Sequence, residues 1–294
     1  MRPRRDGDGA VLRSFRTAAP GGRTVYVVHP GALPADVYRN LAEALPEGSG
    51  LTVLDLGALP AYARAAWTGG RAATTVEELA AGLLDLVGGS LAEAPAPSGG
   101  GGHAFAGWSF GGVLALAMTH LMPAERRPAR LVLLDSIAPT EGYKQPDEAL
   151  EPALLLDWFA MYLGAKRGRP VPVDAARLAG CSVDDGLPAV LDAAAASGAL
   201  PPDTPLPGLR KLYETYVDGL LRNNRLTAVH HPRPAELPLV LVKAERSLVP
   251  GDPALGWGPL APRGLAVHRC PGDHYTMLSR PDSAAVIARL VHPA

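Results

Sequence analysis

Residues 103–121 read HAFAGWSFGGVLALAMTHL, and this stretch decides the fold. It opens as a short apolar run over 103–106, passes through the glycine-flanked Ser109, and continues as an apolar helical pattern over 110–121. The central GWSFG fits the G-x-S-x-G pattern, in which a serine on a strained strand-to-helix turn projects its hydroxyl from the edge of a sheet. The flanking glycines let neighbouring backbone pass close by. The stretch therefore predicts a nucleophilic serine on a strand–turn–helix unit.

Strand-like and helix-like patterns alternate on both sides of this unit. The expected strands are 24–28, 51–56, 103–106, 130–134, 237–243 and 264–269, and helical spacing covers 35–45, 75–91, 110–121 and 283–291. Several strands are apolar without alternation, which favours a parallel sheet covered on both faces. The sequence thus predicts an α/β protein.

Two regions depart from that alternation. Residues 137–235 are Ala- and Leu-rich, broken by proline and without strand signals, so we expect a helical insertion over the end of the sheet. Residues 1–22 show no clear periodicity and are interpreted as an N-terminal tail or linker. The predicted organisation is a tail (1–22), a core (23–136 and 236–294) and a helical lid insertion (137–235).

Composition limits the function classes. The 294 residues hold 28 Lys and Arg against 29 Asp and Glu, a net charge of −1, which argues against a protein that grips nucleic acid or an anionic membrane. Two cysteines cannot form a disulfide framework or a four-cysteine zinc site, and no metal-binding motif is present, so no metal is expected. The longest apolar run, 104–118, is too short to span a bilayer, and no secretory signal opens the chain. We therefore expect a cytoplasmic protein.

A nucleophilic serine needs a general base, and His274 is the best placed of the eight histidines. It follows the last expected strand in the segment PGDHYTML, which puts it at the same end of the sheet as Ser109. The carboxylate that orients the base is predicted to be Asp135, at the end of strand 130–134, with Glu245 and Asp252 after the next strand as alternatives. His274 also gives the chain order Ser, acid, His that α/β-hydrolases share.

An acyl-transfer site also needs two backbone N–H groups that stabilise the oxyanion. One is expected from Phe110, the residue after the nucleophile. The other should come from the loop after the first strand, HPGAL, where Gly31 is the first choice and Ala32 the second.

These motifs together resemble the thioesterase domains that end nonribosomal peptide synthetases and polyketide synthases. The resemblance rests on GWSFGG, LVLLDS, NRLTA running on to HPRP, a GW pair and PGDHYTML, and it covers most of the chain, roughly residues 23–290. It implies an α/β-hydrolase fold, with Ser109 as nucleophile, Asp135 as acid, His274 as base and 137–235 as the lid. Trp108 resembles the peptide-synthetase branch, whereas free-standing editing enzymes more often carry histidine there.

The resemblance also implies a function in natural-product biosynthesis. A carrier protein would present an acyl or peptidyl thioester on its phosphopantetheine arm, and the chain would be released from a seryl ester by hydrolysis or by macrocyclisation. No bound cofactor is implied. The substrate-contacting residues are expected to be Trp108, Trp158, Phe159, Tyr162 and Tyr216, although packing of the lid against the core is the commoner role for such side chains.

Two alternative functions stay open at this point. The same triad could serve an editing thioesterase or general esterase that clears misloaded carriers, and the fold could serve as a non-catalytic carrier-binding module. The sequence gives no indication of oligomeric state, and a free-standing enzyme and an excised terminal domain are both compatible with it.

Overall fold

The computed structural model describes residues 11–68, 74–93 and 102–292. Its centre is a seven-stranded sheet of order β1-β3-β2-β4-β5-β6-β7. All neighbouring strands run parallel except β1, which is antiparallel to β3. The strands are β1 (Leu12–Arg16), β2 (Thr24–His29), β3 (Gly50–Asp55), β4 (His103–Trp108), β5 (Leu131–Leu134), β6 (Leu239–Arg246) and β7 (Leu265–Asp273).

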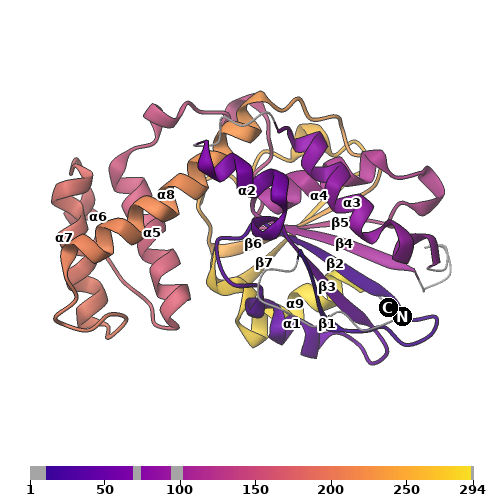
Figure 1. The fold of residues 1–294 in the computed structure, drawn as a ribbon, viewed down its shortest axis with the longest axis horizontal. Coiled ribbons are helices and arrows are strands. Elements are labelled where there is room, and N and C mark those ends of the chain that lie inside the picture. Colours follow the sequence, from indigo (N-terminus) through magenta and orange to yellow (C-terminus); the bar gives the residue numbers. More distant parts are fainter. Residues whose placement is uncertain (1–10, 69–73, 94–101, 293–294) are drawn as a thin grey trace.

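Helices cover both faces of this sheet (Figure 1). Helices α1 (Arg39–Ala44) and α9 (Pro281–Val291) pack together on one face, and α3 (Val76–Glu93) and α4 (Phe110–Leu121) pack together on the other. Successive side chains of a strand point to opposite faces, so β2 sends Val25 and Val27 into one core and Tyr26 and Val28 into the other. This two-sided burial confirms the predicted α/β-hydrolase fold.

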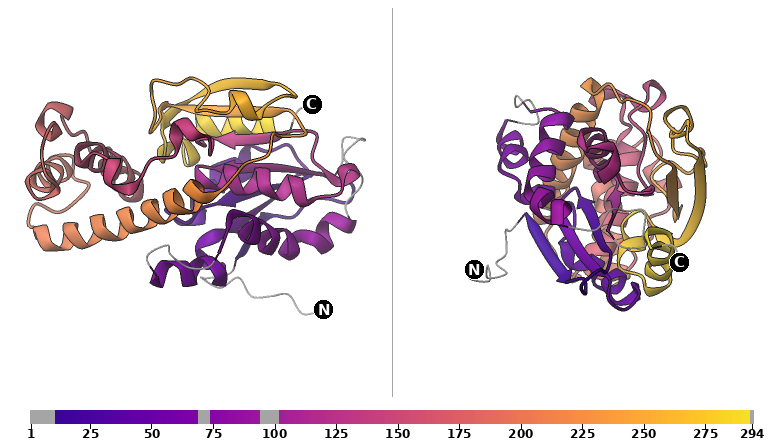
Figure 2. Two further views of the ribbon diagram at one scale, coloured as in Figure 1. Left: turned by 90° about the horizontal axis from the view of Figure 1, so that it is seen from above. Right: turned by 90° about the vertical axis from the view of Figure 1, so that its right-hand side faces the viewer.

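The segment between β5 and β6 is helical. It contains α5 (Pro152–Arg167), α6 (Ala175–Leu178), α7 (Val183–Ala196) and α8 (Leu206–Val229), all within 137–235. Figure 2 shows these helices projecting beyond one end of the sheet, with α8 running back along the core. Within this segment α5 packs on α7 and α8, and α8 also contacts α2 (Pro60–Trp67) of the core.

The prediction of a tail over 1–22 is wrong in part. Residues 1–10 lie outside the described residues, but Leu12–Arg16 forms β1 and pairs with β3 at the edge of the sheet. An edge strand hydrogen-bonds on one side only, and the side chains of LRSFR are half-buried or exposed, so the segment lacks the apolar run that marks the inner strands. Helix α2 was also not predicted. Among the described helices, none is both long and apolar enough to cross a membrane.

Candidate active site

The turn between β4 and α4 places Ser109 in a strained conformation. Its φ is 52° and its ψ −128°, a region that residues other than glycine rarely occupy. The glycines around it are required by close backbone contacts. A Cβ on Gly107 would lie 2.3 Å from the carbonyl oxygen of Gly111, and one on Gly111 would lie 2.1 Å from that of Val28. The GWSFGG motif is therefore a consequence of how tightly β2, β4 and α4 meet.

Asp135 and His274 form a buried hydrogen-bonded pair. Asp135 follows β5 and accepts from the Nδ1–H of His274, which follows β7, at 2.7 Å. The second carboxylate oxygen accepts the backbone N–H of Ala244 on β6 at 3.1 Å. The two residues are only 1% and 2% exposed. Because Nδ1 donates to the carboxylate, Nε2 is left as the basic nitrogen of the ring.

Ser109 and His274 line the same cavity. Trp108, beside the serine, holds the histidine: its indole N–H donates to the carbonyl oxygen of His274 at 2.9 Å, and the two rings lie 5.0 Å apart. Among the described residues, no hydrogen bond joins the side chains of Ser109 and His274. Catalytic hydrogen bonds are often long in the absence of substrate. The structure thus brings the predicted nucleophile, base and acid to one edge of the sheet.

The backbone around the serine offers donors for an oxyanion. Phe110 opens α4, whose first N–H groups face the turn. Gly31 and Ala32 line the same cavity, and Gly31 has a φ of 86°, which favours glycine.

His29 fixes the loop that carries Gly31 and Ala32, a role that was not predicted from the sequence. Its Nε2–H donates to the carbonyl oxygen of Leu33 at 2.6 Å, while Nδ1 lies 3.2 Å from the hydroxyl of Tyr38. Burial lowers the pKa of His29, which keeps the ring neutral and able to make both contacts.

The alternative acids lie elsewhere. Glu245 is exposed near the end of β6. Asp252 accepts from the Tyr143 hydroxyl at 2.5 Å and from the backbone N–H groups of Ala254 and Gly256 at 2.8 Å each. The hydrogen bond from Tyr143 lowers the pKa of Asp252, and desolvation together with that contact raises the pKa of Tyr143 to about 12. Asp252 thus organises its own loop rather than His274.

The cavity has a volume of about 830 Å³ and lies between the sheet edge and the insertion. Trp158, Tyr162 and Tyr216 line it, and their contact with substrate stays a prediction. Trp108 borders it but is fully buried, so its indole serves to position His274 more than to contact a ligand.

The prediction that Phe159 contacts substrate is wrong, because it is fully buried and is not among the lining residues. Its ring packs against Tyr162, Tyr213 and Tyr216 inside the insertion. The α5 residues that line the cavity are spaced four apart, so they share one face of the helix, and Phe159 lies outside that row: Leu154, Trp158, Tyr162 and Lys166.

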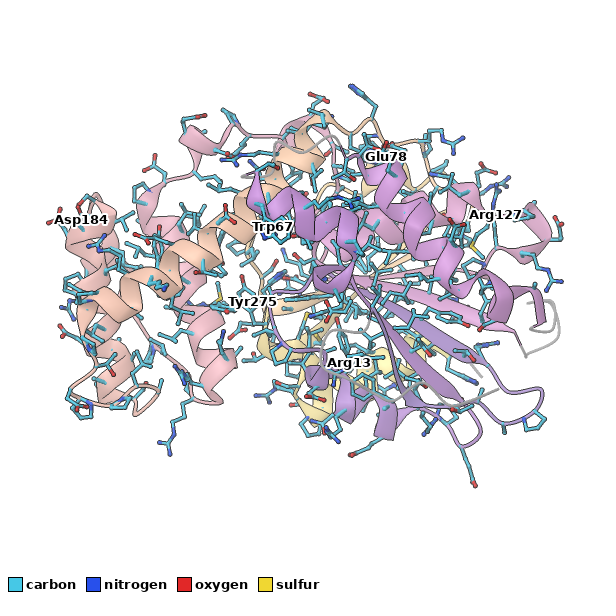
Figure 3. The ribbon with its side chains drawn as sticks, viewed as in Figure 1. Arg13, Trp67, Glu78, Arg127, Asp184 and Tyr275 are labelled. Atoms are coloured by element: carbon cyan, nitrogen blue, oxygen red, sulfur yellow. The ribbon has the colours of Figure 1, made fainter. Side chains whose placement is uncertain are left out.

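A pair of hydroxyl groups joins the insertion to the edge of the sheet that carries His274. Tyr216 on α8 and Tyr275, the residue after His274, are hydrogen bonded at 2.7 Å. Burial raises the pKa of both phenols, so both stay neutral. In Figure 3, Tyr275 lies at the junction between the insertion and the sheet.

Sequence reasoning missed the far wall of the cavity. It is formed where α2 meets α8, from Tyr62, Trp67, Arg222 and Asn223. Trp67 is 85% exposed and is seen at the end of α2 in Figure 3. The signal that could have found this wall is the alanine-rich PAYARAAW segment, whose proline at the first turn is typical of a helix start. Among the described residues, no group of three or more His, Cys, Asp or Glu is placed to hold a metal ion.

Comparison with known proteins adds a family to this geometry. A family model described as a thioesterase domain matches residues 23–294. No curated protein sequence matches the chain. Solved structures also share the fold, among them the three that follow, each less than 25% identical to the chain.

A four-domain nonribosomal peptide synthetase, holo-AB3403 bound to AMP and glycine, is 23% identical with a TM-score of 0.63, over 97% of this chain and 20% of that one. The NocB thioesterase domain, in covalent complex with a fluorophosphonate nocardicin G analog, is 22% identical with a TM-score of 0.57, over 95% and 97%. The Vlm2 thioesterase domain bound with a dodecadepsipeptide is 19% identical with a TM-score of 0.53, over 96% and 97%. The chain therefore spans about a fifth of the synthetase and nearly all of the two single domains.

Proposed function

Because the chain belongs to the thioesterase domain family, we propose that it releases an acyl or peptidyl chain from the phosphopantetheine thioester of a carrier protein through a seryl ester on Ser109. The observation that carries this proposal is the site itself. A strained serine and a histidine paired with a buried aspartate line one cavity, with backbone donors beside them. The family supplies the thioester as the bond that is cleaved.

The proposed reaction has two halves. In the first, His274 takes the proton of the Ser109 hydroxyl while the oxygen attacks the thioester carbonyl carbon. The N–H groups of Phe110 and Gly31 stabilise the tetrahedral oxyanion. The carbon–sulfur bond then breaks, and the thiol leaves with the proton that His274 returns. The acyl group is left as an ester on Ser109.

In the second half, His274 takes a proton from a nucleophile that attacks this ester, the bond to the Ser109 oxygen breaks, and His274 returns the proton to that oxygen. Water gives a free acid, and a hydroxyl or amine of the chain itself gives a ring. An internal nucleophile gains effective molarity when the chain folds inside a cavity that excludes water. The cavity of about 830 Å³ lies within the range that accommodates drug-sized ligands, which favours a long acyl chain over an acetyl group. The solved Vlm2 domain bound with a dodecadepsipeptide also favours a long chain.

Covalent labelling tests the proposal directly. A fluorophosphonate probe should add once to the wild-type chain, and intact-protein mass spectrometry should show this adduct missing in Ser109→Ala. Ser197→Ala is the matched control, because the Ser197 hydroxyl donates only to the Ala194 carbonyl in the insertion. Absence of any adduct on the wild-type chain would favour the non-catalytic carrier-binding module.

A second experiment separates chain release from editing. A long peptidyl thioester and an acetyl thioester are supplied at equal concentration, and the release of thiol is followed. We expect the peptidyl substrate to have the higher kcat/KM. Preference for the acetyl group would instead assign the chain to the clearing of misloaded carriers.

A further inference from the structure

Arg222 on α8 is a cation placed inside the cavity with unused hydrogen-bonding capacity. The residue is 9% exposed and lines the cavity. Its Nη2 donates to Asp218 at 2.7 Å, one turn earlier on the same helix. Its Nε is buried and has no hydrogen-bond partner. Buried polar groups are nearly always paired, so this donor calls for an explanation.

The surroundings of Arg222 hold the guanidinium in place. It lies over the ring of Tyr62 on α2, with its central carbon 4.9 Å from the ring centre. The hydroxyl of Tyr62 donates to Oδ1 of Asn223 at 2.7 Å, which ties the two helices together beside the arginine. Asn223 lines the same wall as Arg222. A cation fixed in this way is preorganised to bind.

The charge inside the cavity is one-sided. Among the described residues that line it, the side chains with a full charge are Lys166 and Arg222, and no carboxylate is present. Asp218, the partner of Arg222, is about half exposed and is not a lining residue. Lys166 is exposed, and its Nζ donates to the hydroxyl of Tyr162 at 2.9 Å. Arg222 is therefore the buried cation of the cavity, and its counter-charge, Asp218, lies outside the lining.

We propose that Arg222 binds an oxyanion of the substrate, and so makes the enzyme selective for thioesters that carry a carboxylate or phosphate group. A guanidinium recognises both groups through charge-assisted hydrogen bonds, which are stronger than neutral ones. The anion is either a carboxylate on the acyl chain or the phosphate of the carrier's arm. This inference rests on the proposed thioesterase function.

The test compares anionic and neutral substrates on the whole chain. One set consists of pentapeptidyl N-acetylcysteamine thioesters with Glu or Gln moved along the peptide one position at a time. The other consists of a neutral pentapeptide carried on pantetheine or on phosphopantetheine. The wild-type enzyme should favour the anionic member of one pair by about 10- to 100-fold in kcat/KM. The pair that shows the preference identifies the source of the anion.

Variants then assign the preference to one side chain. Arg222→Met should abolish the preference for the anionic member, and Arg222→Lys should restore only part of it, because lysine lacks the planar fork. Lys166→Met and Arg210→Gln are matched controls that should retain it. The first removes the exposed cation of the cavity, and the second removes a cation of α8 that pairs with Asp184 outside the cavity. Circular dichroism checks that each variant is folded.

The outcomes separate this inference from the proposed function. A wild-type enzyme that turns over both members of every pair equally contradicts the anion site, even if no Arg222 variant folds. A preference that survives in Arg222→Met, or is lost equally in Lys166→Met, also overturns it. In those cases, fluorophosphonate labelling of Ser109 stays intact and the thioesterase proposal stands. Loss of both labelling and turnover in the wild-type chain would instead sink the thioesterase proposal.

Discussion

The edge of the sheet that carries Ser109, Asp135 and His274, the proposed catalytic edge, faces the helical insertion (137–235) across one cavity. Different forces shape the two regions. At the edge, backbone geometry fixes the positions: Ser109 and Asp135 both have positive φ, and Gly111 lies in contact with β2. In the insertion, side-chain packing fixes them, through an aromatic cluster in which the rings of Tyr162 and Tyr216 stack 4.8 Å apart.

That difference has a consequence for function. Where glycine backbone is this close to a neighbouring carbonyl group, almost no other residue fits, because the Cβ of any side chain would collide with that carbonyl. Side-chain packing admits many solutions of similar volume. The residues at the edge can therefore stay the same and support one type of reaction. Substitutions in the insertion can meanwhile change the shape and charge of the cavity. Arg222 belongs to the variable side of this division.

The largest expected effect is at the acid of the catalytic edge. Asp135→Asn keeps the shape of the side chain but stops it from holding the proper tautomer of His274, so kcat should fall by about 10⁴-fold. Asp252→Asn and the insertion variant Asp184→Asn should change kcat by no more than a few-fold, because neither carboxylate contacts His274. Steady-state hydrolysis of one thioester measures all three. A larger loss in Asp252→Asn than in Asp135→Asn would overturn the assignment of the acid.

A pair of glycines tests the difference in tolerance. In Gly111→Ala the new Cβ would lie 2.1 Å from the carbonyl oxygen of Val28, so the variant should lose about 1–3 kcal/mol of unfolding free energy or more. Gly219 on α8 also borders the cavity, but nothing lies within 4 Å of its Cβ position. Gly219→Ala should therefore gain about 0.5–1 kcal/mol, as expected for alanine in a helix.

Denaturant unfolding monitored by circular dichroism measures both variants. If the two variants shift the midpoint equally, the catalytic edge is no less tolerant than the insertion, and the comparison fails.

The same division explains what the sequence could reveal. Ser109, Asp135 and His274 each follow a strand directly, and parallel strands bring their carboxyl ends to one edge, so local motifs were enough to place them together. Their catalytic roles stay predictions. Arg222 and Tyr62 come from helices α8 and α2, and their meeting depends on tertiary docking that no local pattern encodes. The prediction for Phe159 was wrong for a similar reason, because the sequence does not show which row of α5 faces the cavity.

The smallest expected effect concerns pH, and it compares a histidine of the edge with one of the insertion. Burial lowers the pKa of His29 in the folded chain, whereas the unfolded side chain titrates near 6.5. Between those two values the unfolded chain binds a proton that the folded chain does not. Unfolding free energy therefore rises with pH in that window, by at most about 1.4 kcal/mol per pH unit, and this stability is lost as pH falls below 6.5.

His29→Gln should flatten the pH dependence of unfolding just below pH 6.5, because it removes this proton. Burial also lowers the pKa of His230 at the end of α8, but Glu77, whose Oε1 lies 2.8 Å from Nδ1, opposes that shift. His230→Gln should therefore flatten the profile less. Urea titrations at a series of pH values give the slopes for the wild type and both variants. Equal slopes in the wild type and His29→Gln would mean that burial does not shift the titration of His29, and a neutral His29 would then not be what holds the loop bearing Gly31.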